Sequence, residues 1–167
     1  MRTVGVGGRY SRVADPTWAD PLDIAFAAKT GGRWNPPGLA ALYLNKTREA
    51  ALANARRAVF ERWGRTLEDV RPELLPDLQY VNVAGGGAYL DAVTPEGIAE
   101  LGLAPTYPTD IPHPPCQGIG LAADRAGLDG VSPLSAVAPT QEELVVFARG
   151  MIRVERSSRL RFPWTEA

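Results

Sequence analysis

The stretch from Thr30 to Asn45 reads Thr-Gly-Gly-Arg-Trp-Asn-Pro-Pro-Gly-Leu-Ala-Ala-Leu-Tyr-Leu-Asn. Its two adjacent glycines allow the backbone to take positive φ or to approach a ligand closely. Arg33 follows directly, and a guanidinium held on a tight turn can clamp phosphate oxygens in bidentate fashion. The Asn-Pro-Pro-Gly turn fixes the direction of Arg33, and the apolar run after it predicts a strand over residues 41–44. A plain hairpin connection with a solvated arginine fits the same residues.

The segments on either side alternate between strand and helix patterns. Thr47 can cap a helix that runs to about Trp63, with Gly64 as its stop. Residues 104–115 contain five prolines and are expected to form an extended loop. Strands are predicted at 9–13, 41–44, 78–83, 143–148 and 151–155, the last two joined by a turn at 149–150, and further helices at 22–29, 94–102 and 117–125. This order predicts an α/β (α+β) fold with a mixed sheet and flanking helices, and the length of 167 residues indicates one domain over residues 1–167.

The chain has one cysteine and one histidine, and these counts argue against several kinds of site. With Cys116 alone there is no internal disulfide and no cysteine-type zinc site, and with His113 alone a Ser-His-Asp triad or a histidine metal site is improbable. The chain has no P-loop and no Gly-x-Ser-x-Gly, and Gly5 to Tyr10 fails the dinucleotide fingerprint because its last position is not glycine. We therefore expect no metal in the site.

Charge is distributed unevenly along the chain. Residues 1–65 hold 11 basic and 5 acidic side chains, whereas residues 66–148 hold 2 and 12. A basic first third suits an anionic ligand such as a phosphate ester, and two differently charged faces of one fold explain it equally well. No basic run is interleaved with aromatics, so direct nucleic-acid binding is not expected. Neither a membrane span nor a signal peptide is recognisable, so we expect a cytoplasmic location.

Several segments together resemble the RES domain family. Gly-Gly-Arg33-Trp-Asn-Pro-Pro-Gly followed by Leu-Tyr43-Leu is similar to the family's most specific motif. Tyr10-Ser-Arg12 resembles its opening strand, Asp-Gly-Val-Ser-Pro-Leu-Ser135 resembles its serine segment, and Glu-Leu-Val-Val-Phe147 resembles the strand that follows. The resemblance spans roughly residues 9–149.

The resemblance implies a fold similar to ADP-ribosyltransferase toxins, a split β-sheet around an NAD cleft. It implies a toxin that consumes NAD by hydrolysis, by phosphorolysis or by ADP-ribosyl transfer, held in check by an Xre-like helix-turn-helix antitoxin. Carried over by residue, Arg12 and Arg33 contact the phosphates and ribose, and Tyr43 lies near the nicotinamide. Trp34 is grouped with these contacts, although core packing of Trp34 fits the pattern as well. Ser135, rather than Ser132, is assigned to the nicotinamide ribose.

One position departs from the family pattern. The family's glutamate is expected about eleven residues after the tyrosine, and Asn54 stands there. An amide can bind a ribose hydroxyl but supplies no negative charge to a cationic transition state. Glu61 lies two turns later on the same helix face, about 10.5 Å away along the axis, too far to substitute simply. Native use of asparagine, an inactivating substitution, and an inactive NAD- or nucleotide-binding module all remain open.

Overall fold

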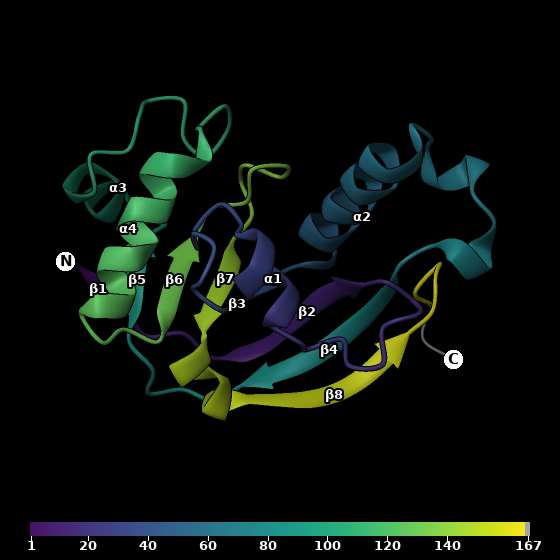
Figure 1. Cartoon of the computed structure of the whole chain (residues 1–167), viewed down its shortest axis with the longest axis horizontal. Helices are drawn as coiled ribbons and strands as arrows, with labels where there is room; N and C mark the ends of the chain where they lie inside the picture. Colours follow the sequence, from purple (N-terminus) through teal and green to yellow (C-terminus); the bar gives the residue numbers. More distant parts are fainter. Residues whose placement is uncertain (166–167) are drawn as a thin grey trace.

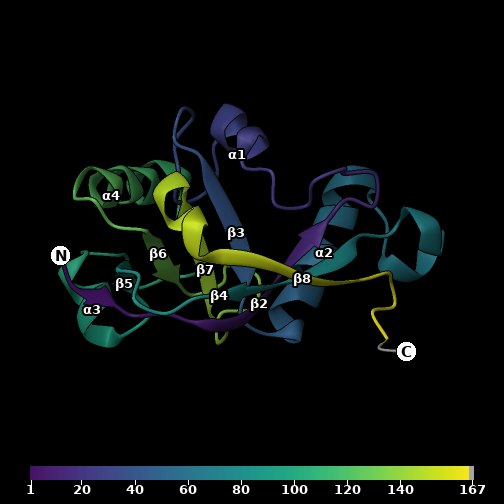
Figure 2. The ribbon, with the colours of Figure 1, turned by 90° about the horizontal axis from the view of Figure 1, so that it is seen from below.

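A computed structural model describes residues 1–165. Eight strands form one mixed sheet in the order β1-β5-β6-β7-β3-β2-β4-β8, with β5 and β6 as the parallel pair. The strands are β1 (Thr3–Val4), β2 (Gly8–Ala14), β3 (Ala41–Asn45), β4 (Asp77–Val83), β5 (Tyr89–Ala92), β6 (Gly130–Pro133), β7 (Glu143–Phe147) and β8 (Val154–Leu160). Figures 1 and 2 place β1 and the end of β8 toward opposite ends of the molecule.

The helices lie over different parts of this sheet. They are α1 (Ala25–Thr30), α2 (Arg48–Trp63), α3 (Pro95–Glu100) and α4 (His113–Arg125), with short 3₁₀ turns at Leu67–Asp69, Pro72–Leu74 and Ala148–Arg153. Figure 1 shows α4 by the β5–β6 end of the sheet, α2 by the β2–β4 end, and α1 between them. The expected α/β class with a mixed sheet and flanking helices is confirmed. Among residues 1–165, no helix is long and apolar enough to cross a membrane.

Both ends of α2 follow from local chemistry. The hydroxyl of Thr47 accepts a hydrogen bond from the backbone N–H of Ala50 at 3.2 Å, which satisfies one of the free donors of the first turn. Gly64 closes the helix at φ +64°, a left-handed conformation that glycine takes without strain. The predicted helix from Thr47 to Trp63 is confirmed.

The sheet is split between β2 and β3. The whole of β2 pairs with β4, whereas its pairing with β3 is limited to Ser11 opposite Asn45. On its other side β3 pairs with β7 over five residues. Because β2 and β3 share so little of the ladder, side chains from both strands can line a cavity rather than pack against one another.

Apolar residues bury both faces of β3. Leu42 and Leu44 belong to a cluster with residues of β2 and β7, whereas Tyr43 packs on the opposite side against the cluster that contains Trp34 and Cys116. A strand buried on both faces reads as a continuous apolar run, which explains the Leu-Tyr-Leu segment. A third cluster joins α2 to β4 and to the C-terminal segment.

Several expected helices and strands begin at other residues or connect differently in the structure. Helix α4 begins at His113, inside the proline-rich segment, because prolines are tolerated in a first helical turn whose N–H groups need no partner. Helix α1 begins at Ala25 rather than at residue 22. The strands near residues 143–155 do not form a hairpin, because the 3₁₀ segment at Ala148–Arg153 carries the chain to the far edge, where β8 pairs with β4.

The Asp-Gly pair at 129–130 leads directly into a strand, since Gly130 begins β6. A Cβ at Gly130 would lie 1.9 Å from the carbonyl oxygen of Val145, so the close approach of β6 to β7 requires glycine. The dipeptide is typical of turns, and this tertiary contact is not visible in the local pattern.

Candidate functional site

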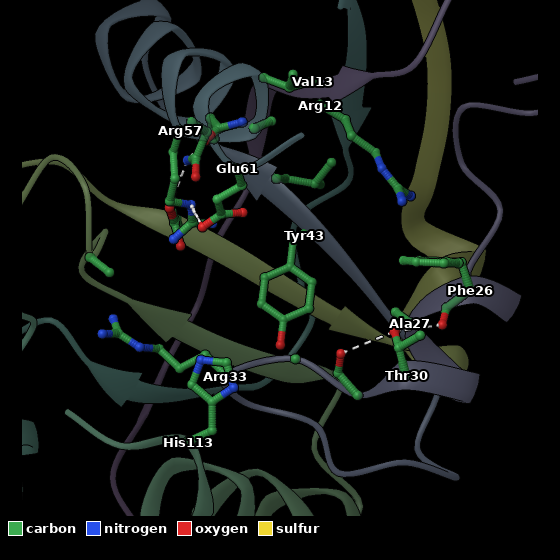
Figure 3. Close-up of a pocket in the computed structure, with 18 of the residues that line it drawn as sticks. Arg12, Val13, Phe26, Ala27, Thr30, Arg33, Tyr43, Arg57, Glu61 and His113 are labelled. Atoms are coloured by element: carbon green, nitrogen blue, oxygen red, sulfur yellow. Dashed lines mark hydrogen bonds and ion pairs between the residues drawn. The ribbon is translucent and has the colours of Figure 1, made fainter. Parts of the chain in front are cut away.

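A cleft of about 560 Å³ lies where the sheet is split. It takes its lining from β2, α1, the Gly-Gly-Arg turn, β3, α2, the first residue of α4 and the first residue of β7. Figure 3 looks into it and shows Tyr43 near the centre, Arg33 and His113 on one side, and Arg12 and Phe26 on the other. The charged side chains that line it are Arg12, Arg33, Arg57, Glu61 and Glu143.

Two glycines shape the turn that enters the cleft. Gly31 has φ +73°, which glycine adopts readily. A Cβ at Gly32 would lie 2.6 Å from the hydroxyl oxygen of Tyr43 and 2.8 Å from Oδ1 of Asn35, so any larger residue would displace one of them. The carbonyl of Gly32 accepts a hydrogen bond from Nε2 of Gln117 at 2.9 Å, which ties the turn to α4.

Asn35 holds the turn together from inside. It is fully buried, and its Nδ2 donates to the carbonyl oxygens of Ala27 at 2.9 Å and Leu39 at 2.7 Å. Its Oδ1 accepts from the hydroxyl of Tyr43 at 2.7 Å. The asparagine therefore links α1, the turn and β3, and fixes the start of the Arg33 side chain.

Only one of the two terminal nitrogens of the Arg33 guanidinium forms a hydrogen bond within the part of the chain that the structure describes. Its Nη2 donates to the carbonyl oxygen of Pro108 at 2.5 Å, whereas its Nη1 is buried and has no hydrogen-bond partner within residues 1–165. A buried donor without a partner is costly, and one on a cationic group more so. Because Arg33 also lines the cleft, this incompletely paired cation is suited to an oxyanion bound there.

Arg12 supplies a second cation from β2. Its Nη1 donates to the carbonyl oxygen of Asp23 at 3.2 Å, and its guanidinium lies 5.3 Å from the ring centroid of Trp18. Burial lowers the pKa of Arg12 to about 10, against the opposing effect of Asp23 and Asp20, so Arg12 stays charged at neutral pH. The cleft thus has an arginine on each side of Tyr43.

The hydroxyl of Tyr43 is committed to the turn. It donates to Asn35 and accepts from the backbone N–H of Trp34 at 2.9 Å. Burial is the main cause that raises the pKa of Tyr43, so the phenol remains neutral. The ring lines the cleft and can contact a ligand, while the oxygen acts as a brace.

Asn54 reaches the cleft from α2. Two alanines that neighbour it on the helix surface, Ala51 and Ala55, are buried in the core. Asn54 and Ala58 line the cleft. Nδ2 of Asn54 donates to Oδ1 of Asn45 at 2.8 Å, to Oε1 of Glu143 at 3.0 Å and to the carbonyl oxygen of Ala50 at 3.2 Å. These acceptors fix the orientation of the amide.

Two of the expected ligand contacts do not line the cleft. Trp34 is fully buried and packs edge-on against Tyr107, with ring centroids 6.3 Å apart. Ser135 is also fully buried, and its Oγ accepts long hydrogen bonds from the backbone N–H groups of Val137 and Ala138 at 3.4 and 3.3 Å. The structure therefore places both in supporting positions, and Ala136 is the residue of that segment that lines the cleft. Arg12, Arg33, Tyr43 and Asn54 are brought together as expected.

Sequence reasoning missed other residues of the cleft. Glu143 is the first residue of an otherwise apolar strand, and an acid at the start of that apolar run is the only local signal. His113 was interpreted as a loop residue, and it lies exposed in the first turn of α4 at the cleft. Phe26 of α1 is 65% exposed and lines the side near Arg12, where an aromatic ring can stack on a planar ligand.

Comparison with known proteins places the chain in a family. The family model described as RES domain matches residues 6–165. A chain of the crystal structure of the M. tuberculosis MbcT–MbcA toxin–antitoxin complex is similar, with a TM-score of 0.81 and 26% identity, covering 96% of this chain and 86% of that chain. No curated protein matches the sequence. Because the family model spans nearly the whole chain, the protein belongs to the RES domain family.

Proposed function

We propose that this protein is the toxin of a toxin–antitoxin system and that it consumes NAD by cleaving the bond between nicotinamide and ribose. Family membership supports the toxin role, as does the similarity to a chain of a toxin–antitoxin complex. The antitoxin we propose is an Xre-like helix-turn-helix protein. Co-expression of such a partner from a neighbouring gene is expected to relieve the growth defect that this chain causes alone.

The observation that carries the NAD proposal is the unpartnered Nη1 of Arg33. It lies buried at the wall of a cleft that holds a second arginine, Arg12, on the other side of Tyr43. The oxyanions of a pyrophosphate suit a guanidinium group at the cleft, and an ordered pyrophosphate fixes the position of the attached ribose. The exposed rings of Trp18 and Phe26 on the Arg12 side offer stacking surfaces for a base.

The chemistry requires charge placement rather than a metal. The bond from C1′ of the ribose to the pyridinium nitrogen breaks, and its electron pair leaves with neutral nicotinamide. The ribose carbon gains positive charge, and the oxygen of water or phosphate bonds to it. With water, the proton that the nucleophile loses passes to solvent. Oriented polar groups in a cleft lower the barrier to such a step.

Product analysis of purified protein incubated with NAD, with and without inorganic phosphate, tests the proposal. Nicotinamide with free ADP-ribose indicates hydrolysis, and ADP-ribose 1″-phosphate that forms only with phosphate indicates phosphorolysis. Arg33→Ala is expected to lower kcat/KM by about 100-fold, because the charge of the guanidinium and the charge-assisted hydrogen bond that its free Nη1 can donate are lost. Arg56→Ala is the matched control, since Arg56 is exposed on α2 and does not line the cleft.

A nucleotide-binding module without turnover is the second candidate. The amide of Asn54 favours it, because a neutral group fixed by three protein acceptors adds no charge to a cationic transition state. On this hypothesis NAD raises the midpoint of thermal unfolding, yet no nicotinamide is released. The same incubation therefore separates the two candidates.

A further inference from the structure

Two carboxylates line the cleft, and their surroundings differ. Glu61 is 68% exposed and forms an ion pair with Arg57, with Nε and Oε1 3.7 Å apart. An exposed, paired carboxylate is strongly screened by water and by its partner. Glu143 is only partly exposed, and within the described chain no basic side chain forms an ion pair with it. The charge of Glu143 is thus the one left available to a ligand.

Polar neighbours hold Glu143 in place. It stands opposite Asn45 in the β3–β7 ladder, and Asn45 stands opposite Ser11 in the β2–β3 pairing. Asn54 donates to both Asn45 and Glu143 from α2. The carboxylate therefore lies at the point where the sheet is split, and the neutral amide of Asn54 orients it without cancelling its charge.

Glu143 also shares surroundings with the site residues. Burial is the main cause of the raised pKa of Tyr43, and the negative charge of Glu143 raises it further while Arg33 opposes the shift. The ring of Tyr43 thus lies within the field of an anion and of a cation. A ligand bound over this ring would therefore lie in the field of Glu143 as well as that of Arg33.

We infer that Glu143 is the catalytic carboxylate that stabilises the positive charge on the ribose as nicotinamide leaves, and that Asn54 is a positioning residue that orients it. This inference rests on the proposed NAD cleavage. As the C1′–N bond breaks, the negative charge of Glu143 faces the developing oxocarbenium ion, and its oxygens can accept a hydrogen bond from a ribose hydroxyl. The carboxylate that the helix lacks is supplied by the neighbouring strand.

The first test is Glu143→Gln, which keeps the shape and an oxygen that accepts from Asn54. We expect kcat for nicotinamide release to fall by about 10²–10³-fold, with the Kd for NAD changed less than about threefold, since a rate effect without a binding effect marks an interaction made in the transition state. Glu142→Gln is the matched control, because Glu142 is the adjacent acid and is exposed. Its kcat is expected to equal that of the wild type.

A charge exchange provides the second test, and its kcat is compared directly with that of the wild type if the single variant fails to fold. The double variant N54E/E143Q exchanges the two groups, so that the carboxylate is on α2 and the amide is on β7. We expect it to recover at least about 10-fold of the kcat lost in Glu143→Gln, because the negative charge returns to the same place in the cleft.

The outcomes separate the inference from the proposed function. If Glu143→Gln turns NAD over as fast as the wild type, the inference alone is overturned. A folded double variant that does not recover turnover overturns it as well. A wild-type protein that releases no nicotinamide overturns both. Loss of kcat in Glu143→Gln with NAD binding intact supports both, and Arg33→Ala is then expected to show the opposite pattern, weakened binding of NAD.

Discussion

Removal of the Tyr43 hydroxyl tests whether this oxygen braces the turn. Tyr43→Phe leaves the backbone N–H of Trp34 and Oδ1 of Asn35 without their partner at 2.9 and 2.7 Å. Each buried polar group left unsatisfied costs about 1–3 kcal/mol, so the two groups together predict a loss of about 2–6 kcal/mol in the free energy of unfolding. For a chain of this size that corresponds to a fall in Tm of about 4–24 °C.

Tyr89→Phe is the matched control. Tyr89 is also fully buried, but its hydroxyl has no hydrogen-bond partner within residues 1–165. Removal of an unsatisfied buried hydroxyl should leave stability unchanged or increase it. Thermal unfolding of the two variants, followed by circular dichroism under identical conditions, measures the difference. Equal losses of Tm in Tyr43→Phe and Tyr89→Phe would refute the assignment of Tyr43 as a brace.

Two further changes test contacts that stabilise the fold. Gly120→Ala is expected to destabilise the protein severely, because its Cβ would lie 1.7 Å from a backbone carbonyl oxygen of the Gly-Gly-Arg-Trp turn. Gly118→Ala in the same helix is the control, since its Cβ meets nothing within 4 Å and the substitution should be neutral or slightly stabilising. A Tm of Gly120→Ala no lower than that of Gly118→Ala would contradict this expectation. Burial works to raise the pKa of Asp91, but hydrogen bonds from Thr94 and the charge of Arg2 keep this pKa below its ordinary value. The ionised carboxylate therefore stabilises the fold above about pH 4, and this contribution is lost as the pH falls. Asp91→Asn should therefore flatten the acid limb of the stability curve in urea titrations at pH 2–7, and an unchanged acid limb would contradict the assignment.

The parts of the fold that sequence predicts are those with local causes. Helix α2 was located by its threonine cap and terminal glycine, both of which act within one turn of the chain. Strand β3 followed from a continuous apolar run, and the Gly-Gly-Arg turn from glycine chemistry and the resemblance to a family. Arg12, Arg33, Tyr43 and Asn54 reach the cleft as expected because these local elements carry them.

The parts that sequence does not predict depend on distant partners. Gly130 belongs to a strand through its pairing with β5 and β7, and the Val145 carbonyl approaches it too closely for a larger residue. Trp34 follows Arg33 directly, yet alternate side chains of the turn point to different places, so one lies at the cleft and the other in the core. Ser135 satisfies backbone donors of its own loop, which composition cannot distinguish from contact with a ligand.

Asn54 shows why a missing charge should be judged in space rather than along one element. The helix position alone suggests a site without its acid, yet its amide lies 3.0 Å from a carboxylate that arrives on β7, 89 residues later. Asparagine is suited to this arrangement, since its Nδ2 donates to Glu143 and Asn45 together, whereas a second carboxylate would repel the first. If a single negative charge is required at the split of the sheet, α2 and β7 are alternative sources of it, and adding a glutamate at position 54 without removing the one at 143 should lower turnover rather than raise it.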